Sequence, residues 1–209
     1  TTLLWVRDHA AELRINVDAI GVAGDSAGAT LASAVALKAR DNGISLAFQA
    51  LIYPCNGRNF ATDSYEKMAT GYGLTTKAMQ WFWEQYLQGT AHDANPYAIP
   101  MVAKDFSGLP TAIVCNNDQA ALGLSYRLIQ SGIEIPEDVS VVGYDDTVAS
   151  LPFLNLTTVR QDPEEIAEAA IGDLVARIKG QQYQSQEILT SSKLVVRTST
   201  GKPKVSTSK

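Results

Sequence analysis

The sequence has little of several residue types that would mark particular functions. Its 209 residues include two cysteines and two histidines, and Lys and Arg (17) are outnumbered by Asp and Glu (22), which gives a formal charge of −5. An acidic chain lacks the electrostatic footprint of a DNA-binding domain, so no nucleic-acid partner is expected. No apolar run reaches membrane-spanning length, and the first residues do not form a signal peptide, so no membrane partner is expected either.

The two cysteines, Cys55 and Cys115, each end an apolar run that has the composition of a strand. This position indicates buried or half-buried reduced thiols in a cytoplasmic protein. The alternative, a single disulfide, stays open because sequence spacing alone cannot support it. We expect neither a bound metal nor a cofactor.

Apolar runs alternate with amphipathic stretches along the whole chain. Strands are predicted at 19–23, 48–53, 111–115, 139–143, 156–160 and 193–198, and helices at 5–13, 27–41, 76–87, 120–132 and 163–179. This alternation predicts an α/β fold with three layers and a mostly parallel, doubly wound sheet.

The segment Gly24-Asp25-Ser26-Ala27-Gly28 matches the pattern G-x-S-x-G between a predicted strand and a predicted helix. A nucleophilic serine on a sharp turn needs small neighbours so that the backbone can bend, and this context is the one that the pattern requires. A helix that starts there points its N–H groups toward developing negative charge. The alternative is an ordinary tight turn that carries a solvated serine.

Further segments accompany this motif: Leu51-Ile52-Tyr53-Pro54, then Asn95-Pro96-Tyr97-Ala98-Ile99-Pro100, then Gly108-Leu109-Pro110. In this order they resemble the hormone-sensitive-lipase-like esterases of the α/β-hydrolase superfamily, over roughly residues 3 to 114. The resemblance implies that Ser26 is the nucleophile and that the N–H of Ala27 is an oxyanion donor. It also implies that Asp118 stands at the position of the triad acid.

Three departures from these esterases weigh against catalysis. Their His-Gly-Gly-Gly oxyanion loop lies upstream of the point where this sequence begins. Where they carry the triad histidine, this chain has Gly143-Tyr144-Asp145-Asp146-Thr147. Of the two histidines, His9 is expected on the exposed side of the first helix, and His92 in a surface loop that would have to fold over Ser26 to act as a base.

The second half of the chain carries four other blocks, at 111–123, 135–147, 156–162 and 193–197. They resemble, in order, the ligand-binding core of lactose- and galactose-repressor-type proteins, which have a periplasmic-binding-protein-like fold. The resemblance implies that Asn117 and Asp145 bind sugar hydroxyls between two lobes. The alternative, which we favour because the opposing lobe is missing, is that both side chains satisfy local turns. The helix-turn-helix headpiece is missing too, so operator binding is not expected.

The chain is therefore predicted to be a hybrid. We expect a hydrolase-like half at 1–110 with the elbow and a cap remnant, a repressor-core-like half at 111–200, a flexible tail at 201–209, and one continuous sheet through the joint. The strand at 19–23 would then form an exposed edge. The helix at 163–179 would lose the cover of its apolar side (Ile166, Ala170, Leu174 and Ile178), which predicts either a rearranged compact domain or a homodimer through that edge or that helix.

The leading functional hypothesis is a recombined or engineered α/β chimera with no efficient inherited activity. One alternative is a residual carboxylester hydrolase that uses Ser26. A second alternative is a weak sugar-type small-molecule binder that uses Asn117 and Asp145.

Overall fold

The computed structural model describes residues 2–180 and 189–202, which divide into two compact units. The first unit extends to Ile113 and the second runs from Val114 to Lys202. The family resemblance of the sequence changes between Pro110 and Val114, so the unit boundary falls within the same few residues. From residue 203 onward, the predicted tail lies outside the described residues.

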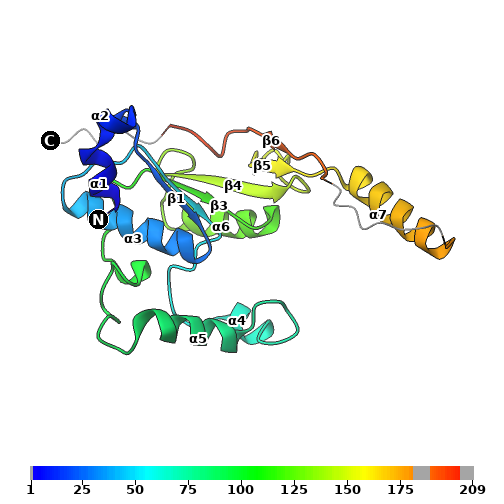
Figure 1. Ribbon diagram of the computed structural model, residues 1–209, viewed down its shortest axis with the longest axis horizontal. Helices are drawn as coiled ribbons and strands as arrows, with labels where there is room; N and C mark the ends of the chain where they lie inside the picture. The colour runs from blue at the N-terminus through cyan, green and yellow to red at the C-terminus, as the bar shows by residue number, and fades with distance from the viewer. Residues whose placement is uncertain (1, 181–188, 203–209) are drawn as a thin grey trace. The chain divides into compact units, whose positions relative to one another are not determined.

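The first unit contains a parallel strand pair with a long helix packed on it. Its elements are α1 (Thr2–Asp8), α2 (Ala10–Leu13), β1 (Val22–Asp25), α3 (Ala27–Asp41), β2 (Gln49–Ile52), α4 (Asp63–Lys67), α5 (Thr76–Leu87) and β3 (Thr111–Val114), which crosses into the second unit. β1 pairs in parallel with β2, and α3 packs on both of them (Figure 1). The buried side chains of Ala29, Ala32 and Leu51 form the core between these elements.

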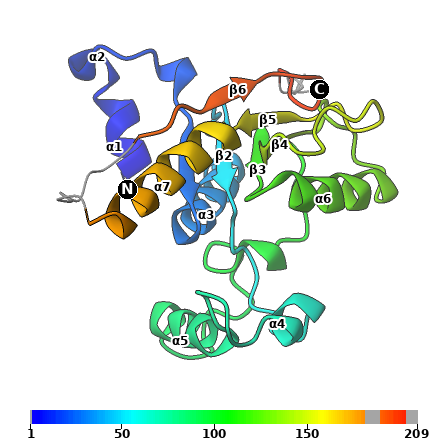
Figure 2. The same cartoon turned by 90° about the vertical axis from the view of Figure 1, so that its right-hand side faces the viewer.

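A separate apolar cluster forms around α5. Figures 1 and 2 agree that α4 and α5 lie together, away from the strands of the first unit. Met79, Trp83 and Leu87 face inward from α5 and pack with Ile99, while Trp81 on the same helix is 55% exposed. The i, i+4 and i+8 spacing of the inward-facing residues is that of one helix face.

The second unit contains α6 (Asp118–Gln130), β4 (Val139–Asp145), β5 (Thr157–Arg160), α7 (Pro163–Ile178) and β6 (Lys193–Val195). β4 pairs in parallel with β5, and β5 pairs antiparallel with β6. α6 packs on β4. Val141, Leu156 and Thr158 are fully buried in this unit.

The predicted α/β class, with helices layered on a mostly parallel sheet, is confirmed. No helix within residues 2–180 and 189–202 is both long and apolar enough to cross a membrane.

Two predicted elements at the N-terminus are wrong in detail. The strand predicted at 19–23 begins only at Val22, because the Asn16 carboxamide accepts a hydrogen bond from the N–H of Asp18 (3.0 Å) and caps a 3₁₀ turn over Val17–Ala19. The helix predicted at 5–13 is two helices that are interrupted at His9.

The buried thiol of Cys115 provides a test of the packing in the second unit. Burial raises the pKa of this thiol from its ordinary value of 9.0 to about 11. Well below pH 9 the thiol is protonated in both the folded and the unfolded state. Between pH 9 and 11 the unfolded chain loses the proton that the folded chain keeps, so the free energy of unfolding is expected to fall by about 1–2 kcal/mol as the pH rises.

Denaturant titrations across this pH range measure the effect. A Cys115→Ala variant should lack this part of the decline, and a Cys55→Ala variant, which retains the buried thiol, should keep it. Parallel stability curves for the parent chain and Cys115→Ala would show that Cys115 is not buried in this way.

Candidate functional site

Ser26 lies on a strained turn between β1 and α3. Its φ of 49° and ψ of −116° place a residue with a side chain in a conformation that favours glycine. The N–H of Ser26 donates to the carbonyl of Ile52 (2.9 Å), and its own carbonyl accepts from the N–H groups of Ala29 (3.1 Å) and Thr30 (3.2 Å). Hydrogen bonds on both sides of the residue therefore hold the elbow conformation.

The two glycines of the motif have different roles. A Cβ on Gly24 would lie 2.3 Å from the carbonyl carbon of Gly28 and 2.4 Å from its carbonyl oxygen, so strand and helix approach too closely for any side chain. A Cβ on Gly28 would meet only Oδ1 of Asp25, at 3.8 Å. The close packing of β1 on α3 therefore depends on Gly24.

Helix α3 presents its first N–H groups beside the serine. Ala27 is the first residue of α3 and is exposed, and its N–H belongs to the helix-terminal groups that have no intrahelical acceptor. Such a group is suited to donate to a developing oxyanion. Thr30, one turn further on, has a structural role that no sequence motif indicated. Its Oγ1 donates to the carbonyl of Cys55 (3.0 Å) and ties α3 to the segment after β2.

Within the described residues, the Ser26 hydroxyl forms no hydrogen bond with another side chain. The described contacts of the two histidines are all with residues other than Ser26. Nδ1 of His9 lies 2.8 Å from the carbonyl oxygen of Trp5, and its ring stacks on the Trp5 indole with centroids 4.4 Å apart. His9 is thus half-buried, not exposed as expected. His92 is exposed in a turn that is closed by the N–H of Asn95.

Asp118 is fully buried in the second unit, where three donors bind its carboxylate. Oδ1 accepts from the hydroxyl of Thr158 (2.7 Å), and Oδ2 accepts from the N–H groups of Thr147 (2.7 Å) and Val148 (3.3 Å). A Cβ on Gly143 would lie 2.3 Å from Oδ1, so a glycine is needed there to make room for the carboxylate. The residue at the predicted triad-acid position therefore joins the start of α6 to β5 and to the segment after β4.

Asn117 and Asp145 also have local partners. The Asn117 side chain caps α6 by accepting from the N–H of Ala120 (2.7 Å). Oδ1 of Asp145 accepts from the amide nitrogen of Gln161 (2.7 Å). Asp145 has a φ of 94°, so the residue at the end of β4 is strained.

An ion-pair network around the buried Asp146 follows Asp145 and has no counterpart in the sequence predictions. The Asp146 side chain is 4% exposed and lies between Arg160, at 2.5 Å, and Arg197, at 2.9 Å. Asp146 also has a positive φ, of 57°. The two guanidinium groups stabilise the turn after β4, and nothing local in the sequence indicated that Arg197 would reach it.

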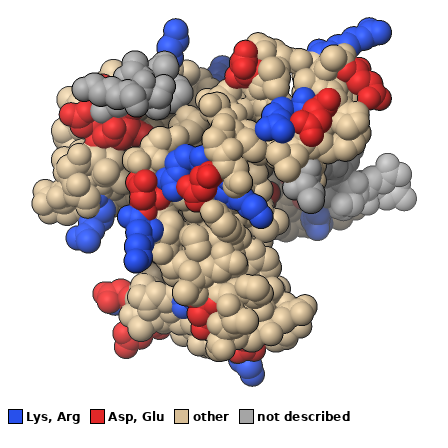
Figure 3. All heavy atoms as spheres, turned by 90° about the vertical axis from the view of Figure 1, so that its left-hand side faces the viewer, with Lys and Arg blue, Asp and Glu red and all other residues tan. Residues whose placement is uncertain are grey.

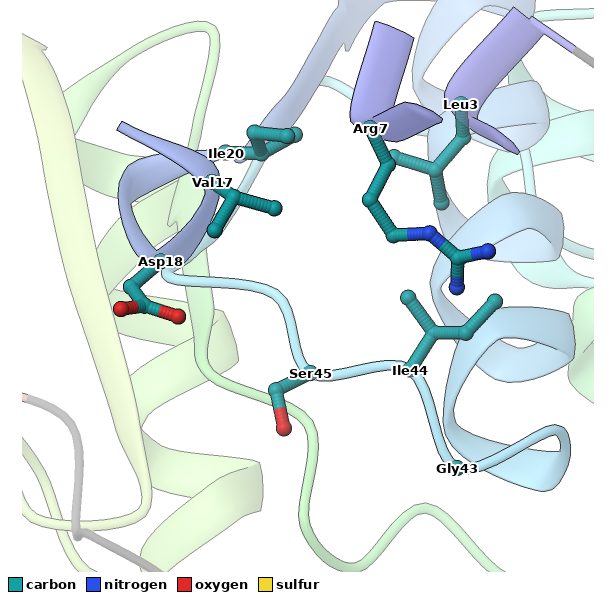
Figure 4. Close-up of a pocket in the computed structure, with 8 residues that line it drawn as sticks. All are labelled: Leu3, Arg7, Val17, Asp18, Ile20, Gly43, Ile44 and Ser45. Carbon is teal, nitrogen blue, oxygen red and sulfur yellow. The ribbon is translucent and has the colours of Figure 1, made fainter. Parts of the chain in front are cut away.

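A small cavity of about 190 Å³ lies in the first unit, lined mainly by apolar side chains such as Leu3, Val17 and Ile44 (Figure 4). Its cationic group, Arg7, already pairs with Asp8 at 3.0 Å. None of the residues predicted for catalysis or binding lines this cavity.

The described residues contain no group of three or more histidine, cysteine, aspartate or glutamate side chains placed to hold a metal ion. Lysine, arginine, aspartate and glutamate are mixed on the face that Figure 3 shows.

Two family models match the chain. A model described as the α/β-hydrolase fold matches residues 1–123, and a model described as periplasmic binding proteins and the sugar-binding domain of the LacI family matches residues 63–198. The two matches overlap over residues 63–123.

Individual relatives divide in the same way. An arylesterase of Saccharolobus solfataricus is 34% identical over 137 residues, which is 63% of this chain and 45% of the relative. A transcriptional repressor, PurR of Vibrio vulnificus, is 42% identical over 89 residues, which is 42% of this chain and 27% of the relative.

Among solved structures, a thermostable esterase from Pseudomonas putida aligns with a TM-score of 0.56 and 31% identity, over 67% of this chain and 45% of that esterase. A solved arylesterase aligns with a TM-score of 0.52 and 29% identity, over 67% of this chain and 49% of that protein. The chain therefore spans less than half of each of these relatives.

The glycine geometry of the elbow predicts unequal effects for two alanine substitutions in one motif. Gly24→Ala is expected to lower the free energy of unfolding by about 1–3 kcal/mol or more, because the new methyl group overlaps the backbone of α3. Gly28→Ala, in the first turn of a helix with open space around its Cα, should stay within about 1 kcal/mol of the parent. Urea titration of both variants measures the difference, and equal effects would contradict the close approach at Gly24.

Proposed function

Because the chain belongs to the α/β-hydrolase family over residues 1–123 and to the LacI-type sugar-binding family over residues 63–198, we propose that it is a recombined or engineered hybrid whose esterase elbow does not hydrolyse esters efficiently. The missing proton acceptor carries this proposal. A serine hydroxyl is a weak nucleophile unless an adjacent base takes its proton. The segment Gly143-Tyr144-Asp145-Asp146-Thr147 has no histidine where the esterases carry one.

The surroundings of the two histidines support the proposal. His9 forms its polar contact with the Trp5 carbonyl and stacks on the Trp5 ring, and His92 is exposed. A base has to come within about 3 Å of the hydroxyl proton that it removes, directly or through one water molecule. Neither imidazole has a described hydrogen bond to Ser26.

The contacts of Asp118 support the proposal as well. In a catalytic triad the carboxylate accepts a hydrogen bond from the imidazole N–H and orients the ring. Both oxygens of Asp118 instead accept hydrogen bonds from its own unit, and the three donors are Thr147, Val148 and Thr158. This carboxylate acts as a structural acceptor.

Hydrolysis of p-nitrophenyl butyrate, compared between the parent chain and Ser26→Ala, tests the proposal. We expect the two rates to agree within about twofold, since removing the serine of a working triad costs about 10⁶-fold in turnover. Ser45→Ala, which changes an exposed loop serine, is the matched control. A rate that depends on Ser26 by tenfold or more would instead support the residual carboxylester hydrolase.

The second alternative, a sugar-type binder, has less support from the contacts. Asn117 is used as a helix cap and Asp145 is bonded to Gln161, so each side chain already has a protein partner. Calorimetric titration with a galactoside at millimolar concentration is expected to give no heat beyond dilution. A binding isotherm that disappears in Asp145→Ala but persists in Ser45→Ala would favour the binder, and loss of the isotherm in Ser45→Ala alone would place the binding at the cavity that Ser45 lines.

A cytoplasmic location and the absence of a nucleic-acid partner are part of the same proposal. Both cysteines carry free thiols, and the thiol of Cys115 is buried, which suits a reducing compartment. The excess of acidic over basic residues supports the expectation that the chain does not bind nucleic acid.

A further inference from the structure

Helix α7 has an apolar side that no part of its own unit buries. None of its 16 residues is buried. Ile171 is 60% exposed, Leu174 56% and Ile178 76%. Leu174, Val175 and Ile178 follow Ile171 at spacings of three, four and seven residues, and with Ile166 they form a stripe along one half of the helix surface.

The sequence nevertheless specifies this helix clearly. The Asp162 carboxylate caps it by accepting from the N–H of Glu165 (3.0 Å), and Pro163 occupies its first position. Figure 1 shows α7 extending away from β4, β5 and β6 of the same unit. An isolated helix of this length is marginal in water and depends on burial of its apolar side. A well-capped helix with an uncovered stripe therefore needs a partner.

We propose that the partner is α7 of a second copy of this chain, packed antiparallel. The charges along the helix are arranged for this pairing. Glu164, Glu165 and Glu168 lie in its first half, and Arg177 and Lys179 lie at its end, where Arg177 also pairs with Asp173 of the same helix at 3.0 Å. An antiparallel pair brings the acidic start of each helix next to the basic end of the other and opposes the two helix dipoles, whereas a parallel pair would bring like charges together.

The side-chain sizes along the stripe are also self-complementary. If the twofold axis passes between Ala170 and Ile171, each of these residues faces the other in the second copy, and Ala167 faces Leu174. Small residues then lie opposite large ones, so the two helices interdigitate at close distance. A surface that is complementary to itself is typical of a twofold homodimer, in which both subunits contribute the same patch. Binding to a different partner would not require this self-complementarity.

A neighbouring segment adds apolar area to the proposed interface. Oε2 of Glu165 accepts hydrogen bonds from the N–H and hydroxyl of Ser191, so the segment before β6 lies beside the start of α7. In this segment and in β6, Leu189 is 85% exposed and Leu194 63%. Two helices of about 24 Å bury less area than a stable dimer needs, and these side chains extend the surface toward roughly 1,000 Å².

Size-exclusion chromatography with light scattering on the full chain is the first test. We expect twice the chain mass of 22.5 kDa for the parent, and a mass halved to that of one chain for Leu174→Asp. Ile129→Asp is the matched control, because Ile129 is a 62% exposed aliphatic residue on α6, and this variant should remain dimeric. A monomeric parent at high concentration, or a dimer that Leu174→Asp does not weaken, would overturn the proposal.

Disulfide trapping then tests the orientation and does not rely on a disruptive substitution. The antiparallel pair places residue 171 of one chain near residue 171 of the other, so Ile171→Cys should form a covalent dimer on mild oxidation. Ile178→Cys should not, because its two copies lie at opposite ends of the pair. The parent chain, whose own thiols are buried or half-buried, gives the background. Trapping through both positions, or only through residue 178, would overturn the antiparallel arrangement.

Discussion

The buried carboxylate of Asp118 is the interaction on which the second unit depends. It lies at the start of α6 and accepts hydrogen bonds from the segment after β4 and from β5, so one side chain joins three elements. Gly143 provides the space that this requires, because any side chain there would overlap the carboxylate. A buried charge without such donors would cost several kcal/mol, and the geometry of the strand ends is therefore tied to this residue.

This role changes how the likeness to the esterases is to be interpreted. Asp118 follows strand β3 and was predicted, from the resemblance to those enzymes, to stand at the position of their triad acid. The same position, however, is an acceptor for backbone and hydroxyl donors in this chain. A likeness of fold between two α/β families therefore does not by itself transfer a residue's chemical role, because function resides in sites placed on common folds.

The sequence predicted those parts of the structure that local signals determine. The helices at 27–41 and 76–87 have the predicted bounds, and the second begins where the Thr75 hydroxyl accepts from the N–H of Ala78. It did not predict contacts between distant residues, such as the bond between Asp118 and Thr158, forty residues apart, or the pairing of Asp146 with Arg197. It also missed the break at His9, because the apolar spacing continues through this residue although its φ of −107° and ψ of 16° are not helical.

The elbow shows the same difference between local and distant contacts. Neighbouring elements determine its backbone geometry, whereas its reactivity depends on residues far away in the sequence. Ser26 keeps its strained conformation because β1, β2 and α3 hold it through the Ile52 carbonyl and the first turn of the helix, all within the first unit. A base that would make the hydroxyl a nucleophile is not part of this local packing, and the chain that follows the first unit matches the LacI-type sugar-binding family. On the proposed hybrid origin, joining two α/β families at a strand preserves the geometry that neighbouring elements impose and replaces what distant loops contribute. A nucleophile elbow is on this account a property of local packing, and its reactivity is a property of the whole sheet.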